Sequence, residues 1–153
     1  MKILIATDGS DFSDAAINKC ADMVLKPEET EIKVISVYER LRPMSGEPFG
    51  VSNEYYNQAE KASKKLAFEA VEKAVQTLQQ RFPKVVLSTA VEPGGAAKVI
   101  VETAEDWHAN MILMGSHGRG FWARNMIGSV SDGVVHHAPC SVMIIRKAEQ
   151  TAA

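Results

Sequence analysis

Two glycine-containing stretches in the second half of the chain combine the residue types that bind phosphate. The first, Gly115 to Gly120, directly follows an apolar run, and the second, Gly128 to Ser131, comes after a short spacer. Glycines let backbone N–H groups approach an anion closely. We expect the second stretch to open a helix, whose first N–H groups favour a phosphate, with the Ser129 and Ser131 hydroxyls as further donors. The pattern therefore predicts an anion site, with a plain turn followed by a helix cap as the alternative.

The spacing excludes the lysine-dependent phosphate loop of many nucleotide hydrolases. Gly115 and Gly120 have the separation of a Walker A loop, but Phe121 and Trp122 stand where that loop needs Lys and Ser or Thr. The catalytic lysine of that loop is therefore missing.

Three histidines have the chemistry of metal ligands or general bases. His117 lies in the first glycine stretch, and His136 and His137 follow the second. The sequence has no H-E-x-x-H, no G-x-S-x-G and no cysteine at zinc-finger spacing near them, so we expect neither catalysis nor a metal site there. His117 is still a candidate phosphate contact. Arg119 and Arg124 are further candidates because their charge is permanent, with solvated surface as the alternative for each.

Five short apolar runs rich in β-branched residues alternate with helical patterns, which is typical of βαβ units and a parallel sheet. The first helical pattern ends before Pro27, the second at Pro83, the third follows Pro93, and the fourth runs from Ser129 to Pro139. The apolar runs, which we predict to be strands, are Lys2 to Ala6, Glu31 to Val37, Val85 to Val91, Asn110 to Met114, and Ser141 to Arg146.

Right-handed crossovers between parallel strands would place the helices on both faces of an open, doubly wound α/β sheet. Such sheets bind ligands beyond the carboxyl ends of their strands, near the point where the strand order reverses. That edge receives Thr7 and Asp8, Val37, and the chain from Gly115 onward. The segment from Leu41 to Asn53, with two prolines and two glycines, is predicted to be a loop.

The composition indicates one cytosolic domain. The 153 residues include 46% hydrophobic residues and carry a formal net charge of −2, which gives no basic footprint for nucleic acid or an anionic membrane. No run approaches the ~20 apolar residues of a membrane span, and no secretory signal precedes Asp8. We expect a single domain over residues 1–148 with a short tail, 149–153. Cys20 and Cys140 have no metal-ligand spacing and are expected to be reduced and partly buried.

The glycine pattern resembles that of the universal stress protein family, in its ATP-binding branch. The motif of that branch is Gly, two residues, Gly, nine residues, Gly, then Ser or Thr. Here Gly115, Gly118, Gly128 and Ser129 match it without a mismatch, and the similarity spans essentially the whole chain. The resemblance implies a single Rossmann-like domain, similar to adenine nucleotide alpha hydrolases, whose five parallel strands have the order 3-2-1-4-5.

The resemblance also implies ATP as the ligand, with ADP or AMP as alternatives and Mg²⁺ held mainly by the phosphates rather than by side chains. It places phosphates near Gly118 and the Gly128 to Ser131 stretch, ribose near Asp8 and Gly115, and adenine near Ala6 and Val37. We expect no catalytic residue. The complete set of expected ligand contacts is Ala6, Thr7, Asp8, Val37, Met114, Gly115, Ser116, His117, Gly118, Arg119, Gly128, Ser129, Val130 and Ser131.

The residue types are compatible with these roles. Asp8, at the end of the first run, can accept hydrogen bonds from ribose hydroxyls, although capping of the first helix or of the turn at Gly9 is the alternative. Val37 ends the second run, where its backbone N–H and C=O could read an adenine edge. Met114 and Pro93 would then supply apolar walls.

The last run, Val142 to Ile145, would offer unpaired backbone groups to another chain if it is an edge strand. The resemblance implies an antiparallel homodimer through it, and a buried internal strand is the alternative. Our leading hypothesis is a cytosolic ATP-binding regulatory or stress-response module with slow or no hydrolysis, in which the nucleotide changes the loops at 41–53 and 115–127. The rivals are a weak ATPase or nucleotide-transferring enzyme that uses Asp8 with Arg119 or Arg124, and a nucleotide-free dimeric scaffold.

Overall fold

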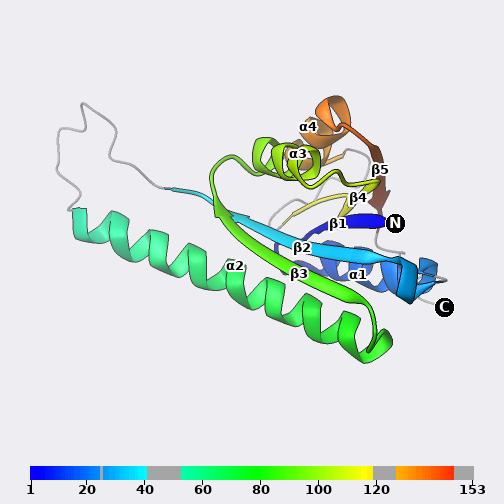
Figure 1. Ribbon diagram of the computed structural model, residues 1–153. Helices are drawn as coiled ribbons and strands as arrows, with labels where there is room; N and C mark the ends of the chain where they lie inside the picture. The colour runs from blue at the N-terminus through cyan, green and yellow to red at the C-terminus, as the bar shows by residue number, and fades with distance from the viewer. Residues whose placement is uncertain (25, 41–52, 119–126, 147–153) are drawn as a thin grey trace, which may run out of the picture.

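The five predicted strands form one parallel sheet with the order β3-β2-β1-β4-β5 in the computed structural model, which describes residues 1–24, 26–40, 53–118 and 127–146 (Figure 1). The predicted fold class and strand order are confirmed. The strands are β1 (Lys2–Ala6), β2 (Glu31–Tyr38), β3 (Val86–Pro93), β4 (Met111–Gly115) and β5 (Ser141–Ile145).

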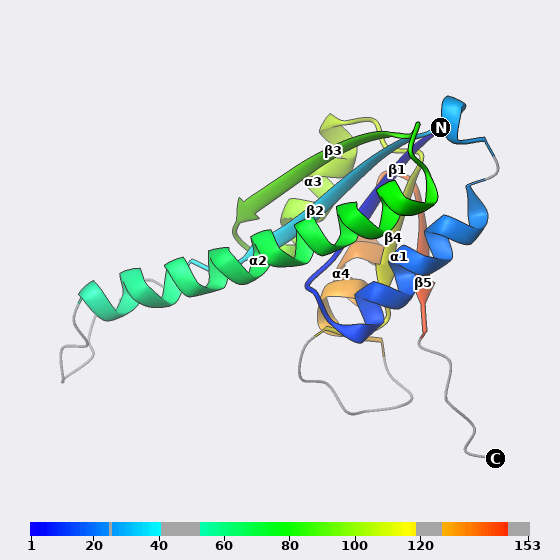
Figure 2. The same ribbon diagram turned by 90° about the horizontal axis from the view of Figure 1, so that it is seen from below.

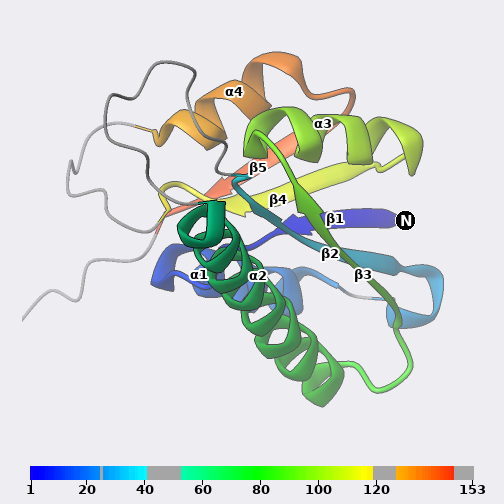
Figure 3. The same ribbon diagram turned by 90° about the vertical axis from the view of Figure 1, so that its left-hand side faces the viewer.

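The helices cover both faces of the sheet, as predicted. Figure 3 shows α1 and α2 on one face and α3 and α4 on the other. A short 3₁₀ turn, Pro27–Glu29, joins α1 to β2 and was not predicted. The helices are α1 (Asp11–Met23), α2 (Asn53–Arg81), α3 (Ala96–Asp106) and α4 (Ser129–His137).

The alternation of side chains along the strands divides the core into two layers. Ile5 and Ile17 belong to the layer that packs under α1 and α2, whereas Leu4 and Ile100 belong to the layer under α3 and α4. Cys20 lies in the first layer, and burial raises the pKa of its thiol to about 12. Both cysteines are free thiols, as predicted.

Three strands continue further toward the carboxyl edge of the sheet than the apolar runs indicated. β2 and β3 extend to Tyr38 and Pro93, which pair with each other, and β4 includes Gly115. Pro93 is tolerated because β3 is an edge strand. The segment predicted as a loop at 41–53 lies outside the described residues, apart from Asn53, which begins α2.

The 29-residue helix α2 is longer than the sheet that it covers. At 1.5 Å per residue it spans about 43 Å, and its first part projects past the ends of the strands (Figures 1 and 2). Its buried residues start only at Ala67. Among the described residues, no helix has the length and apolar character needed to cross a bilayer.

The packing of α2 on the sheet makes a stability prediction. Leu78 is fully buried in the layer under α1 and α2, so Leu78→Ala should lower the free energy of unfolding by about 3 kcal/mol through lost burial and a cavity. Val135→Ala on α4, where the side chain is 47% exposed, should change it by less than about 1 kcal/mol. Urea denaturation followed by circular dichroism measures both, and equal losses would contradict this placement of the core.

Candidate functional site

The turn after β1 is fixed by hydrogen bonds of Thr7 to β2 and to the start of α1. The Thr7 N–H donates to the Ile35 carbonyl over 2.9 Å, which continues the β1–β2 ladder by one bond. The buried Thr7 hydroxyl donates to Ser13 Oγ over 3.0 Å and accepts from the Gly9 N–H over 3.2 Å. The first turn of α1 is therefore tied to the end of β1.

Asp8 has two oxygens with different surroundings. Its Oδ1 accepts a hydrogen bond from the Ser10 N–H over 3.0 Å, so the carboxylate stabilises the turn. The N-cap of α1 is Ser10 rather than Asp8, because Ser10 Oγ accepts from the Ser13 N–H over 3.3 Å. Oδ2 points at Gly118, since a Cβ atom placed on that glycine would lie 2.9 Å from it.

The exit from β4 passes very close to α1. A Cβ atom on Gly115 would lie 2.6 Å from the backbone carbonyl carbon of Phe12, a separation that no side chain would permit. The loop then continues through Ser116 and His117 to Gly118, where an added Cβ atom would first meet the Asp8 carboxylate. The absence of side chains on both glycines is what lets the two strand exits meet.

The start of α4 is held against the end of β4 by two hydrogen bonds. The Gly128 N–H donates to the Ser116 carbonyl over 2.8 Å, and the buried Ser131 hydroxyl donates to the Gly115 carbonyl over 2.9 Å. The hydroxyl proton of Ser131, predicted to face a phosphate, is thus used within the protein. The backbone N–H groups of Ser129, Val130 and Ser131, which have no acceptor inside the helix, are the donors at this end.

His117 packs beside α1 and lines the site. Its Nδ1 lies 3.0 Å from Ser116 Oγ, and its ring centroid lies 5.2 Å from that of Phe12. No cluster of three or more potential metal-ligating side chains occurs in the part of the chain that the structure describes. Arg119 and Arg124, the predicted cationic partners, lie outside the described residues.

The backbone N–H and C=O of Val37 face the side of β2 on which β1 lies. The Ile35 carbonyl bonds to β1 and the Tyr38 carbonyl to Gly94 beyond β3, so odd-numbered residues at this end of β2 face β1. The N–H and C=O of Val37 therefore face the β1 side, beyond the last bond of that ladder. This is the position that the sequence predicted for reading the edge of a base.

These groups surround one cavity of about 540 Å³ at the carboxyl edge of the sheet. Ser116 is buried and is absent from the lining, and Pro93, predicted as an apolar wall, is absent from it as well. The predicted residues that the structure brings together around this cavity are Ala6, Thr7, Asp8, Val37, Met114, Gly115, His117, Gly118, Gly128, Ser129, Val130 and Ser131.

The cavity also has lining residues that the sequence did not indicate. Those from β2, together with Glu39 just after it, are sequence neighbours of the predicted Val37. The prediction that β2 ends at this edge could therefore have included them. Those from α1, α2 and α3 carried no local signal, because helical periodicity marks buried faces and not the residue that meets a ligand. The additional lining residues are Ser13, Ile35, Ser36, Tyr38, Glu39, Ser63, Leu66, Ala67, Ala96 and Ile100.

The charges of the described lining are mainly acidic. Asp8 and Glu39 are carboxylates, His117 is the titratable base, and no lysine or arginine occurs among the lining residues that the structure describes. Within the described lining, the groups that favour an anion are backbone N–H groups and the positive end of α4.

Comparison with known proteins supports the resemblance. A family model described as the universal stress protein family matches residues 1–146. A putative universal stress protein of Staphylococcus saprophyticus is 30% identical over 96% of this chain and 84% of that protein, and a universal stress protein of Methanocaldococcus jannaschii is 33% identical over 95% and 82%.

Solved structures of universal stress proteins share the fold. One from Lactobacillus plantarum has a TM-score of 0.78 at 22% identity and covers 95% of this chain and 97% of its own. One from Arabidopsis thaliana, solved with AMP bound, has a TM-score of 0.68 at 16% identity and covers 100% and 95%. Another, in complex with cAMP, has a TM-score of 0.67 at 19% identity and covers 97% and 98%. With its family model, its relatives and its fold in agreement, this chain belongs to the universal stress protein family.

Proposed function

We propose that this protein is a cytoplasmic ATP-binding regulatory module with slow or no hydrolysis. The observation that carries the proposal is the meeting of Asp8, Gly118 and the first N–H groups of α4 around one cavity. The AMP and cAMP complexes of two universal stress proteins show that other members of the family bind adenine nucleotides.

The proposed pose follows the chemistry of the lining. Phosphates would accept hydrogen bonds from the backbone N–H groups at the start of α4 and from Gly118. The ribose would lie at Asp8, whose Oδ2 side faces the loop while Oδ1 stays bonded to Ser10. The base would lie beyond β2, where the backbone of Val37 can pair with its edge, beside Met114.

The same lining favours binding over turnover. Hydrolysis of a γ-phosphate needs a positioned water and groups that stabilise the charge of the transition state. Asp8 is engaged by the Ser10 N–H, which makes it a positioning group for the turn. We propose that Mg²⁺ accompanies the nucleotide and is held mainly by its phosphates, because Mg²⁺ keeps several waters and needs few protein ligands.

The role of Gly118 can be tested with one methyl group. Gly118→Ala would place a Cβ 2.9 Å from Asp8 Oδ2, so the carboxylate or the loop must move, and ATP affinity should fall on the order of 10-fold. Gly95→Ala is the matched control, because its Cβ would have no neighbour within 4 Å. Isothermal titration calorimetry with ATP measures both variants. Equal affinities for Gly118→Ala and the wild type would refute this site.

Removal of Mg²⁺ should weaken ATP more than AMP. Asp8 and Glu39 are carboxylates in the described lining, and they would repel a triphosphate that has lost its cation. With EDTA in the buffer, ATP affinity should fall on the order of 10-fold, whereas AMP, with less charge to neutralise, should change little. Calorimetric titrations with and without EDTA test this, and equal ATP affinity in both buffers would exclude a role for the metal.

We further propose that two chains pair antiparallel through β5. The strand is an edge of the sheet, not the internal strand of the alternative prediction. Ser116 donates to the Ile145 carbonyl, so odd-numbered residues of β5 face β4 and the N–H and C=O of Val142 and Ile144 face outward. Such an edge offers backbone groups to a second copy.

The dimer proposal predicts opposite results for two substitutions at Ile144. Ile144→Pro removes an outward N–H and should leave a monomer, while Ile144→Ala loses the same packing but keeps that N–H and should stay dimeric. Light scattering on the eluted protein gives the mass of each. A monomeric wild-type protein would contradict the proposal.

A further inference from the structure

Gly133 lies in the middle of α4, at a position where glycine weakens a helix. The helix runs from Ser129 to His137, and a glycine inside a helix is less favourable than alanine because it loses more conformational freedom on folding. Its backbone conformation does not call for glycine, since the described glycines with positive φ are Gly9 and Gly94. Any structural requirement for glycine here therefore concerns the space around the residue.

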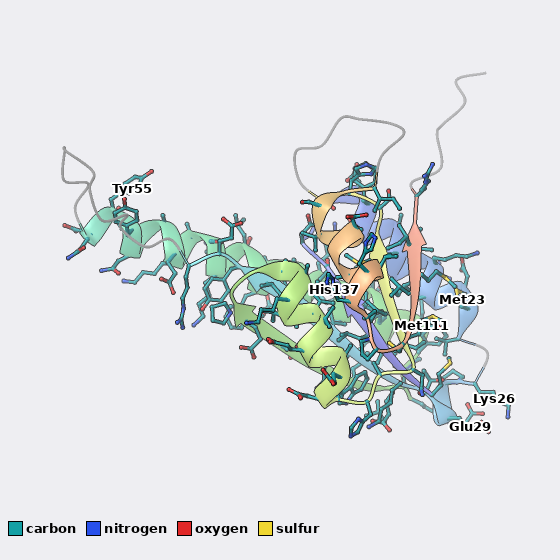
Figure 4. All side chains as sticks on the ribbon, turned by 90° about the horizontal axis from the view of Figure 1, so that it is seen from above. Met23, Lys26, Glu29, Tyr55, Met111 and His137 are labelled. Carbon is teal, nitrogen blue, oxygen red and sulfur yellow. The ribbon has the colours of Figure 1, made fainter. Side chains whose placement is uncertain are left out.

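The neighbouring helix α3 fills that space. A Cβ atom on Gly133 would lie 2.9 Å from the Cβ of Ala97, whereas carbon atoms in contact normally lie about 3.5–4.0 Å apart. Ala97 is the second residue of α3 and packs in the core layer under α3 and α4. Figures 3 and 4 show the two helices side by side, with His137 labelled at the end of α4 in Figure 4. The missing side chain therefore lets the two helices approach each other closely.

This close contact lies about one helical turn from the cavity. Gly133 follows Ser129 by four residues, so both lie on the same side of α4. Ser129 lines the cavity, and its N–H has no acceptor inside the helix. On α3, Ala96 lines the cavity directly before Ala97. The approach of Gly133 to Ala97 thus sets the separation of the two helix starts at the cavity.

The start of α4 is also held to the end of β4. The Gly128 N–H donates to the Ser116 carbonyl over 2.8 Å, and the Ser131 hydroxyl donates to the Gly115 carbonyl over 2.9 Å. A displacement of α4 away from α3 would disturb both bonds, and a hydrogen bond stretched beyond about 3.5 Å contributes little. The N–H groups at the start of α4 are thus positioned by β4 and α3 together.

We propose that Gly133 is a positioning residue for the anion-binding end of the cavity. This inference rests on the proposed nucleotide-binding function. Gly133 is absent from the cavity lining, so it acts through α4, whose first N–H groups it keeps at the separation from α3 that a bound phosphate requires. Backbone donors stabilise a phosphate only within hydrogen-bond distance, so a displacement of about 1 Å removes most of their effect.

The test adds one methyl group and then makes room for it. Gly133→Ala should lower ATP affinity on the order of 10-fold, although alanine is the better helix former. Ala97→Gly removes the atom that the new methyl group would meet. The double variant Gly133→Ala/Ala97→Gly should therefore bind ATP within about 2-fold of Ala97→Gly alone.

Gly95→Ala is the matched control for the added methyl group. Gly95 is the N-cap of α3, and a Cβ atom there would have no neighbour within 4 Å, so this variant should keep the ATP affinity of the wild type. Isothermal titration calorimetry with ATP measures all four variants, and thermal melts followed by circular dichroism report their stability.

The double variant separates positioning from a general loss of stability. A merely structural role of Gly133 would change the melting temperature of Gly133→Ala and leave its ATP affinity unchanged, which would overturn the proposal. An affinity loss that Ala97→Gly fails to restore would overturn it as well. If Gly133→Ala alone does not fold, the double variant must fold and bind ATP like Ala97→Gly, and its failure to do so is a refutation. A wild-type protein that binds no adenine nucleotide would instead refute the proposed function itself.

Discussion

The contact between the backbones at Gly115 and Phe12 is the constraint on which the rest of the site depends. A side chain at residue 115 would begin 2.6 Å from the Phe12 carbonyl carbon, so only glycine lets β4 exit across the first turn of α1. This approach places Gly118 against Asp8, and the Ser131 hydroxyl then holds the start of α4 to the same turn through the Gly115 carbonyl. Strand exits and a helix terminus are thereby brought to one cavity.

In this nearly neutral chain, the described donors of the proposed anion site belong to the backbone. The formal net charge is −2, and the described lining holds two carboxylates. The N–H groups at the start of α4 and the dipole of that helix supply the positive potential that lysines supply elsewhere. Backbone groups also lie at the end of β2. Because β1 ends at Ala6 and the chain then enters α1, the N–H and C=O of Val37 lie beyond the last bond of the β1–β2 ladder.

The two ends of the cavity differ in how firmly they are supported. At the α4 end, the Ser131 hydroxyl donates to the Gly115 carbonyl and the Gly128 N–H to the Ser116 carbonyl, which holds the start of the helix in a fixed position. The β2 end is bounded by α2, whose first part has no buried residue. The first end is thus held in a pre-formed geometry, whereas the second borders a helix whose buried residues start only at Ala67.

The sequence by itself determined the sheet, its strand order through the family resemblance, and most of the residues around the cavity. Alternating apolar runs, proline stops and a glycine motif are local patterns, and local patterns specify strands, helices and turns. Only the tertiary structure decided that the Ser131 hydroxyl donates to the Gly115 carbonyl, that Pro93 does not line the cavity, and that Leu66 does. Each of these depends on how elements distant in sequence pack together, and periodicity along one element carries no information about its partner.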